Sequence, residues 1–315
     1  MNIIFTVCNR NSLANALALA NSAMQYPESI FYLCWVDTDE ISELPESIKL
    51  LPVSALQLPQ WEQMVSEYYD FELLPASRPW FAKHLFHIHP ELNTLTFLAP
   101  TVFLYSPIDS VISADAGMQV TPHITDALEK SSILDDKRIL NVGMFHAGSW
   151  VMSRSEQSMK FLGWWSERTV DRAKFDLCNG MCMDQLWLNF VLVRIPDAKQ
   201  LTHPGWHYGL HSVLNKKIEL RSNKYFVDNE SLVSADFAGL EFFDPVWSDH
   251  APLLGQSSLF KKLYIDYKKA VSPFRKYVPA GKPGLGRIAD VKSNRLFRKK
   301  LTGQLKSLTR FIDQF

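Results

Sequence analysis

The sequence predicts an α/β protein whose central sheet is mixed, mostly parallel and flanked by helices. The chain opens with an apolar strand at residues 2–8, an Ala- and Leu-rich helix at 13–26 and a second buried strand at 30–36. This order is that of a βαβ unit, so the two strands should lie parallel. A further apolar strand at 95–98 is suited to the buried middle of such a sheet.

Later elements follow from local patterns. A short strand is expected near residues 49–53, and residues 79–91 have helical spacing. Residues 148–152 have the composition of a strand, and residues 155–169 form an amphipathic helical pattern. Residues 178–192 read as a loop followed by a helix, with Asp184 and Gln185 in the first turn of that helix.

The central strand at 95–98 ends at the stretch 99–101, Ala-Pro-Thr. Proline cannot donate to a central ladder, so the strand should stop there. Ligands of open α/β sheets bind outside the carboxyl ends of the strands. We therefore expect residues 99–101 to lie at the functional site.

Length and composition are those of a globular chain. The 315 residues are 47% hydrophobic and 21% charged, which suits one large domain and an appendage. No window approaches the roughly 18 consecutive apolar residues of a spanning helix. Four cysteines and no cleavable leader lead us to expect free thiols and a cytoplasmic location. We expect Cys178 and Cys182 to be buried rather than to bind zinc, because no second pair completes a metal set.

Charge divides the chain near residue 250. Residues 251–315 carry 15 Lys and Arg against 3 Asp and Glu, whereas residues 1–250 carry 18 against 30. Such asymmetry indicates a basic segment with its own partner. We predict a ligand-binding domain at 1–250 and a basic, largely helical extension at 251–315.

Several short segments follow one another along residues 2–243. They are IIFTVCNRN, FELLPASRPW, a central strand ending in SPID, TPHIT, FLGWWSER, GMCMDQLWLNFV, THPGWHYG and DFAG. In this order and spacing the chain resembles nucleotide-sugar glycosyltransferases of the GT-A fold, close to the family 8-like enzymes of bacterial surface-polysaccharide gene sets. The resemblance implies a Rossmann-like fold and transfer of a sugar from a nucleotide-sugar donor to a glycan or lipid-linked acceptor.

The resemblance also implies a nucleotide site. The residues concerned are Thr6, Cys8, Asn9, Asn11, Arg78 and Thr101. The loop after the first strand would meet the base, although an Asn-rich loop is also ordinary turn chemistry. The guanidinium of Arg78 suits a diphosphate, and a surface ion pair with a neighbour such as Glu72 is the alternative.

Asp184 and Gln185 match the family's Asp-Gln pair, which the resemblance implies to be catalytic. A carboxylate there can bind sugar hydroxyls, orient the donor or stabilise developing positive charge. The alternative is an Asp that only caps the start of a helix.

The family's metal site is altered. Where the family carries Mn²⁺ or Mg²⁺ on an Asp-x-Asp pair, this chain has Ala-Pro-Thr at 99–101. Hard divalent cations need oxygen ligands, preferably carboxylates. Asp236 stands at the third ligand position and alone would form a weak site. We therefore expect no usual metal site, with Mn²⁺ or Mg²⁺ left as an alternative.

Three histidines have the spacing of metal ligands on one face of a helix. His203, His207 and His211 stand four apart, but the proline and glycines between them make a helix improbable. We expect no three-histidine metal site. One of His146, His207 or His211 could instead supply, as imidazolium, the positive charge that the missing metal would have given.

Two functional classes remain open. The first is an active glycosyltransferase that works without the usual metal site. The second is a non-catalytic relative that keeps the fold and serves as a binding or assembly subunit. Fold similarity alone does not choose between them.

Residues 294–315 predict an amphipathic basic helix. Its apolar stripe consists of Phe297, Leu301, Leu305, Leu308, Ile312 and Phe315. Basic residues fall largely off this stripe, as in helices that lie on anionic membranes. We expect peripheral binding to the inner face of the membrane, with packing of the stripe against the catalytic domain as the alternative. No aromatic base-stacking pattern accompanies the charge, so no nucleic acid partner is expected.

Overall fold

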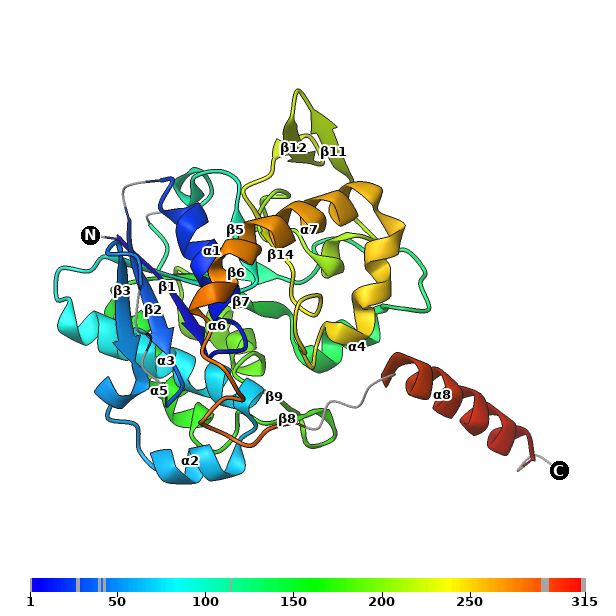
Figure 1. Ribbon diagram of the computed structural model, residues 1–315, viewed down its shortest axis with the longest axis horizontal. Helices are drawn as coiled ribbons and strands as arrows, with labels where there is room; N and C mark the ends of the chain where they lie inside the picture. The colour runs from blue at the N-terminus through cyan, green and yellow to red at the C-terminus, as the bar shows by residue number, and fades with distance from the viewer. Residues whose placement is uncertain are drawn as a thin grey trace.

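The computed structural model shows a central seven-stranded sheet between helices (Figure 1). It describes residues 2–26, 29–38, 41, 44–113, 115–289 and 295–312. The strand order is β10-β6-β7-β4-β1-β2-β3. The strands are β1 (Asn2–Cys8), β2 (Ser29–Trp35), β3 (Ile48–Pro52), β4 (Thr94–Leu98), β6 (Met118–Pro122), β7 (Phe145–Ser153) and β10 (Lys199–Gln200). Only β7 runs antiparallel to its neighbours, so the predicted mixed, mostly parallel α/β class is confirmed.

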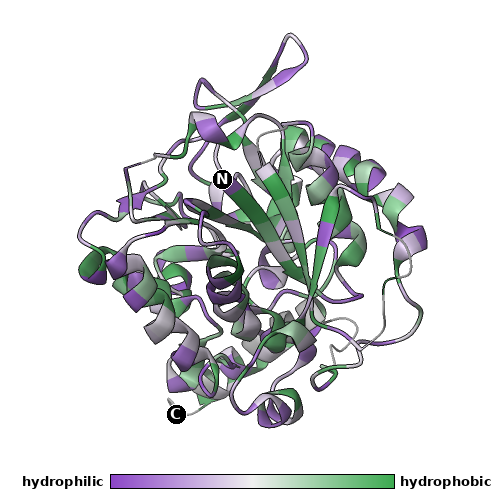
Figure 2. Ribbon diagram, turned by 90° about the vertical axis from the view of Figure 1, so that its left-hand side faces the viewer, coloured by the Kyte–Doolittle hydropathy of each residue, from purple (hydrophilic) through white to green (hydrophobic). Residues whose placement is uncertain are grey.

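The predicted βαβ opening is present. β1 pairs in parallel with β2 on one side and with β4 on the other, which places it in the middle of the sheet. Between β1 and β2 lies α1 (Leu13–Ala23), whose small Ala side chains allow ten of its eleven residues to be buried. Figure 2 shows the apolar strands enclosed by helices with polar outer faces.

The two faces of the sheet carry different helices. On one face α3 (Asp70–Ile88) packs with α5 (Glu156–Thr169), and on the other α1 packs with α7 (Ser258–Val271). The helix expected at 79–91 is thus the second half of the longer α3. Short elements complete the fold: α2 (Trp61–Glu67), α4 (Asp136–Val142), α6 (Val191–Arg194), β8 (Phe175–Asp176), β9 (Met181–Cys182), β11 (Ile218–Arg221), β12 (Lys224–Val227) and β13 (Glu230–Ser231).

The break after β4 builds a second, smaller sheet. β4 ends at Leu98, and after residues 99–101 the chain continues as β5 (Val102–Leu104). β5 pairs antiparallel with β14 (Ser234–Asp236). Two segments far apart in sequence therefore meet just beyond the carboxyl end of the central strand.

The chain beyond residue 250 returns to the body of the protein. α7 buries Phe260, Leu263 and Tyr267, and the amide of Asn15 in α1 donates to the hydroxyl oxygen of Tyr267 at 2.7 Å. Farther on, Arg287 exchanges main-chain hydrogen bonds with residues 68 and 70 at the start of α3. The division at residue 250 stays a prediction, since the part beyond it packs on the same core.

A buried ion pair holds this returning segment over the amino-terminal half. Arg10 donates from Nε and Nη2 to the carboxylate of Asp37 at 2.8 and 2.7 Å. Arg10 also donates to the carbonyl of Ala280, and the amide of Gly284 donates to Asp37. The loops that follow β1 and β2 and residues 280–284 are thereby joined in one hydrogen-bonded group.

The last helix is α8 (Arg295–Ile312), which lies apart from the other elements in Figure 1. The described part of the predicted stripe is exposed, with Phe297 67% and Leu305 55% accessible. Phe315 and Asn294 lie outside the described residues. Among the described helices none combines the length and the apolar character that crossing a membrane requires.

The cysteines are free, as expected, but not all are buried. Cys8, Cys34 and Cys182 are buried, whereas Cys178 is exposed. The expectation of burial was therefore wrong for Cys178. Its place in a short 3₁₀ turn between β8 and β9 explains this, because tight surface connections leave little for a side chain to pack against.

Candidate functional site

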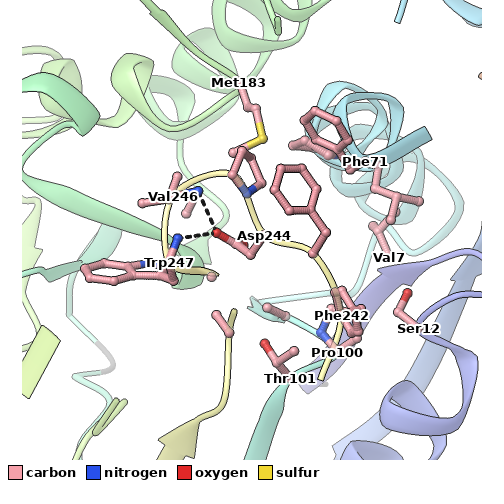
Figure 3. Close-up of a pocket in the computed structure, with 18 of the residues that line it drawn as sticks. Val7, Ser12, Phe71, Pro100, Thr101, Met183, Phe242, Asp244, Val246 and Trp247 are labelled. Atoms are coloured by element: carbon pink, nitrogen blue, oxygen red, sulfur yellow. Dashed lines mark hydrogen bonds between the residues drawn. The ribbon is translucent and has the colours of Figure 1, made fainter. Parts of the chain in front are cut away.

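A cavity opens beyond the carboxyl ends of β1 and β4 (Figure 3). Its volume is about 240 Å³, which is many times the roughly 10–15 Å³ that one water occupies by the same kind of measure. Most of the site residues expected from the sequence line it. They are Asn9, Asn11, Arg78, Thr101, Asp184, Gln185 and Asp236. The stretch 99–101 lies at the site, where the end of the central strand was expected to place it.

Thr6 and Cys8 are not brought into this cavity. Side chains alternate along a strand, so Val7 faces the cavity while its two neighbours point to the buried layers. The main chain of Cys8 is also engaged, because its carbonyl accepts from the amide of Val36. Burial raises the pKa of the Cys8 thiol far above its ordinary range. The loop after β1 therefore reaches the cavity through other residues.

Asn9 and Asn11 form the part of that loop that faces the cavity. The side-chain oxygen of Asn9 accepts from the amide of Asn11 at 3.0 Å, which is the expected turn chemistry. The amide group of Asn11 donates to Asp70 at the start of α3, also at 3.0 Å. The loop is thus held in place by hydrogen bonds before any ligand arrives.

Arg78 projects from α3 toward the segment after β9. Its Nη1 donates to Oδ2 of Asp184 and to the carbonyl of Ala147, each at 2.8 Å. The guanidinium also lies 4.3 Å from the ring centre of Phe97. Glu72, the partner considered from the sequence, instead accepts from two main-chain amides near α3. Arg78 therefore pairs across the cavity and not along its own helix.

Asp184 does not cap a helix. The segment after it is a 3₁₀ turn at Leu186–Phe190 followed by α6, and Asp184 accepts from Arg78 instead. Its second oxygen, Oδ1, is buried and makes no hydrogen bond within the described residues. Burial raises the pKa of Asp184 to about 6, and the charge of Arg78 opposes that rise. One carboxylate oxygen thus remains available to a ligand.

Gln185 is fully engaged by the protein. Its oxygen accepts from the amide of Ala147 at 3.1 Å, and its nitrogen donates to the carbonyl of Val142 at 2.8 Å. Both bonds tie the segment after β9 to β7 and α4. Both polar atoms of the Gln185 side chain are therefore used within the protein.

The residues present do not fit a Mn²⁺ or Mg²⁺ site of the family's kind. At 99–101 the two potential ligand positions are a methyl group and a hydroxyl. The hydroxyl of Thr101 donates to Oδ1 of Asp236 at 2.6 Å, and the amide of Ala238 donates to the same oxygen at 3.1 Å. One carboxylate cannot provide the oxygen cage that these hard cations require.

The segment of His203, His207 and His211 is not an α-helix, in agreement with its proline and glycines, and only its end forms a short 3₁₀ turn at Leu210–Ser212. His203 is partly exposed beside Glu230, while His207 and His211 are buried with His146. Burial lowers the pKa of His207 to about 3 and that of His146 and His211 well below the ordinary value. The suggestion that one of them is an imidazolium was therefore wrong, because desolvation keeps these rings neutral.

Aromatic and acidic residues that sequence reasoning missed complete the cavity. Figure 3 shows Phe71, Phe242 and Asp244 around its mouth. Asp244 accepts from the amides of Val246 and Trp247 at 2.8 and 2.7 Å, which fixes the turn that carries them. The run Phe-Phe-Asp-Pro after DFAG was the available signal, since binding residues often lie on loops and aromatic rings offer large contact areas.

Comparisons with known proteins give distant likenesses. No protein-family model matches the chain. YfnF, an uncharacterized protein of Bacillus subtilis (strain 168), is 27% identical over 226 residues, which are 66% of this chain and 72% of that protein. The structure of the galactosyltransferase LgtC with donor and acceptor sugar analogs is 13% identical at a TM-score of 0.46, covering 82% of this chain and 96% of that one. A glycosyltransferase involved in glycosylation of the major capsid of PBCV-1 is 10% identical at a TM-score of 0.46, covering 80% and 98%. Likenesses this distant assign no activity to the chain.

Proposed function

We propose that the protein is a glycosyltransferase of the GT-A type that transfers a sugar from a nucleotide-sugar donor to a glycan or lipid-linked acceptor. The observation that carries the proposal is the meeting of Arg78 and Asp184 in a cavity at the carboxyl edge of the sheet. These two residues come from segments more than one hundred positions apart. The resemblance of their local sequences to the GT-A family and the hydrogen-bonded Asn9–Asn11 loop add support.

Each group has a chemical task in this proposal. The guanidinium of Arg78 stabilises the leaving nucleoside diphosphate, a role that a poorly hydrated cavity strengthens. The free oxygen of Asp184 accepts a sugar hydroxyl and stabilises positive charge developing on the sugar. Gln185 holds the segment that carries Asp184 against the start of β7. No step in this scheme uses Mn²⁺ or Mg²⁺.

A panel of nucleoside diphosphates and nucleotide sugars tests the proposal, first by thermal shift and then by donor hydrolysis. We expect one class of nucleotide to raise the midpoint of unfolding. D184N should lower the hydrolysis rate by about 10²–10³-fold, as the loss of a preorganised electrostatic group does. The exposed Asp197 provides the matched control, because D197N makes the same chemical change away from the cavity. No shift with any nucleotide would contradict the proposal.

The second candidate function is a non-catalytic binding or assembly subunit. It is favoured by the Thr101–Asp236 bond, which occupies a carboxylate oxygen where the family holds its metal. This class would be selected if the protein binds a nucleotide but neither hydrolyses the donor nor transfers sugar to any acceptor. D184N should then change nucleotide affinity alone.

We further propose that α8 binds the surface of an anionic membrane, where lipid-linked acceptors are found. Leu301, Leu305 and Leu308 are each at least 44% exposed, so this stripe is not packed on the core. Each nearby basic residue adds about 1 kcal/mol of attraction to an anionic leaflet. Insertion of the apolar stripe into the membrane interface then supplies the remaining free energy of binding.

Sedimentation with anionic liposomes at low salt tests this role. A truncation after Ala289 is suitable, because Ile288 and Ala289 still line the cavity. The full chain should sediment and the truncated chain should not, while both bind nucleotide. L305D should weaken sedimentation more than T302D, although each adds one negative charge to α8. Equal effects of the two variants would show that the stripe is not inserted.

A further inference from the structure

Three buried ligating side chains converge below the cavity. His146 lies on β7, His207 lies between β10 and β11, and Asp236 ends β14. Each offers a nitrogen or carboxylate oxygen within 4.8 Å of those of the other two. None of the three is more than 4% exposed. Three separate segments of the fold therefore bring one set of ligands together.

His207 is the least satisfied member of this group. It is completely buried, and neither ring nitrogen makes a hydrogen bond within the described residues. A buried polar group without a partner destabilises the folded protein. His207 also has a φ of 54°, a left-handed backbone that is uncommon among residues other than glycine and is often found at functional sites.

Asp236 presents its other oxygen to His207. While Oδ1 accepts from Thr101, Oδ2 lies 3.4 Å from Nε2 of His207 without a hydrogen bond between them. Two ligands that each stand about 2.0–2.1 Å from a tetrahedral ion are about 3.3 Å apart. The observed spacing is therefore that of neighbouring ligands on one ion.

The surroundings support such a site. Nε2 of His146 lies 3.0 Å from Nδ1 of His211, and such a bond to a second side chain is typical of ligating imidazoles. Gly148 leaves space beside His207, since a Cβ there would stand 3.3 Å from Cε1 and Nε2 of the ring. His146 and Asp236 line the cavity, which provides a path of entry.

We infer that His146, His207 and Asp236 form a binding site for a divalent transition metal of the Zn²⁺ type. Two imidazoles and one carboxylate suit zinc and its neighbours in the first row, whereas Mg²⁺ and Mn²⁺ prefer oxygen. Three protein ligands leave a coordination position on the side of the cavity. This inference does not depend on the proposed transferase activity, because it concerns only the ion and its protein ligands.

Calorimetric titration of the full chain tests the site, with any affinity tag removed and the protein first freed of metal by a chelator. Zn²⁺ should bind with one tight site per chain, and Mg²⁺ under the same conditions should give no comparable binding. H207Q and D236N should each weaken Zn²⁺ binding by at least about 100-fold, since loss of even an outer partner costs about 10–100-fold. Co²⁺ should give the visible absorption bands of a low-symmetry site in the wild type and in H203Q, and not in H207Q or D236N.

His203 provides the matched control, since it belongs to the same segment but stands apart at Glu230. H203Q should bind Zn²⁺ as the wild type does. Circular dichroism of each metal-free variant shows whether it is folded. If H207Q is unfolded, Zn²⁺ binding by D236N tests the inference instead. Absence of tight Zn²⁺ binding to the wild type, or equal binding by H207Q, D236N and H203Q, would overturn the inference.

Discussion

The ion pair of Arg78 and Asp184 should be worth several kcal/mol to the folded state. The two side chains are 12% and 1% exposed, so the pair is buried rather than superficial. Removing one partner of a buried pair costs about 3–5 kcal/mol, against about 0–1 kcal/mol for an exposed pair. D184N should lie near the lower figure, because Asn keeps an oxygen that accepts from the guanidinium.

R78M should cost more than D184N. It removes the bond to the carbonyl of Ala147 and the contact with the ring of Phe97 as well as the charge. The loss of unfolding free energy caused by R78M should become smaller as the pH is lowered from 8 to 5. Burial already raises the pKa of Asp184 to about 6, and without Arg78 its carboxylate can take up a proton and lose its charge.

Urea unfolding of the wild type, both single variants and the double variant measures these terms. In the double variant no charge is left unpaired, so we expect a coupling free energy of about 2 kcal/mol or more. The slope of the free energy of unfolding against urea should stay constant, which shows that the same surface unfolds. Single losses below about 1 kcal/mol, or strictly additive losses, would refute the view that this pair is buried and coupled.

Three further outcomes are expected. Burial raises the pKa of Asp244 to about 6, so the folded protein holds this proton more tightly than the unfolded chain. The free energy of unfolding should then fall as the pH rises from about 4 to about 6, and D244N should remove that part of the dependence. Mn²⁺ or Mg²⁺ added to metal-free protein should leave the midpoint of nucleotide binding unchanged, since residues 99–101 offer no carboxylate. In native protein a thiol reagent should modify Cys178 alone quickly, and rapid reaction of a second thiol would contradict its burial.

The sequence was informative where local patterns decide the structure. The βαβ opening, the central strand with its break at 99–101 and the amphipathic helices follow from periodicity and from the chemistry of proline. That Asn9 and residues 99–101 line the cavity follows from one further rule, that ligands meet the carboxyl ends of strands. Arg78 and Asp184 were expected there only because their local sequences resemble the GT-A family.

The rest depended on contacts between distant segments. Nothing local shows that Arg78 pairs with Asp184, that Thr101 donates to Asp236, or that a returning segment reaches Asp37. His207 is a clear case. Its spacing from His203 and His211 gave no indication of Asp236, beside which tertiary packing sets it. Such pairings arise from the whole fold and leave no short-range periodicity.

A crystal structure of the full chain soaked with a nucleoside diphosphate tests the central claim most directly. We expect the base against the loop of Asn9 and Asn11, and the diphosphate within hydrogen-bonding distance of Arg78. The free oxygen of Asp184 should face the place of the transferred sugar. A nucleotide bound outside this cavity, or bound in it with Arg78 still turned wholly to Asp184 and Ala147, would contradict the proposed mechanism.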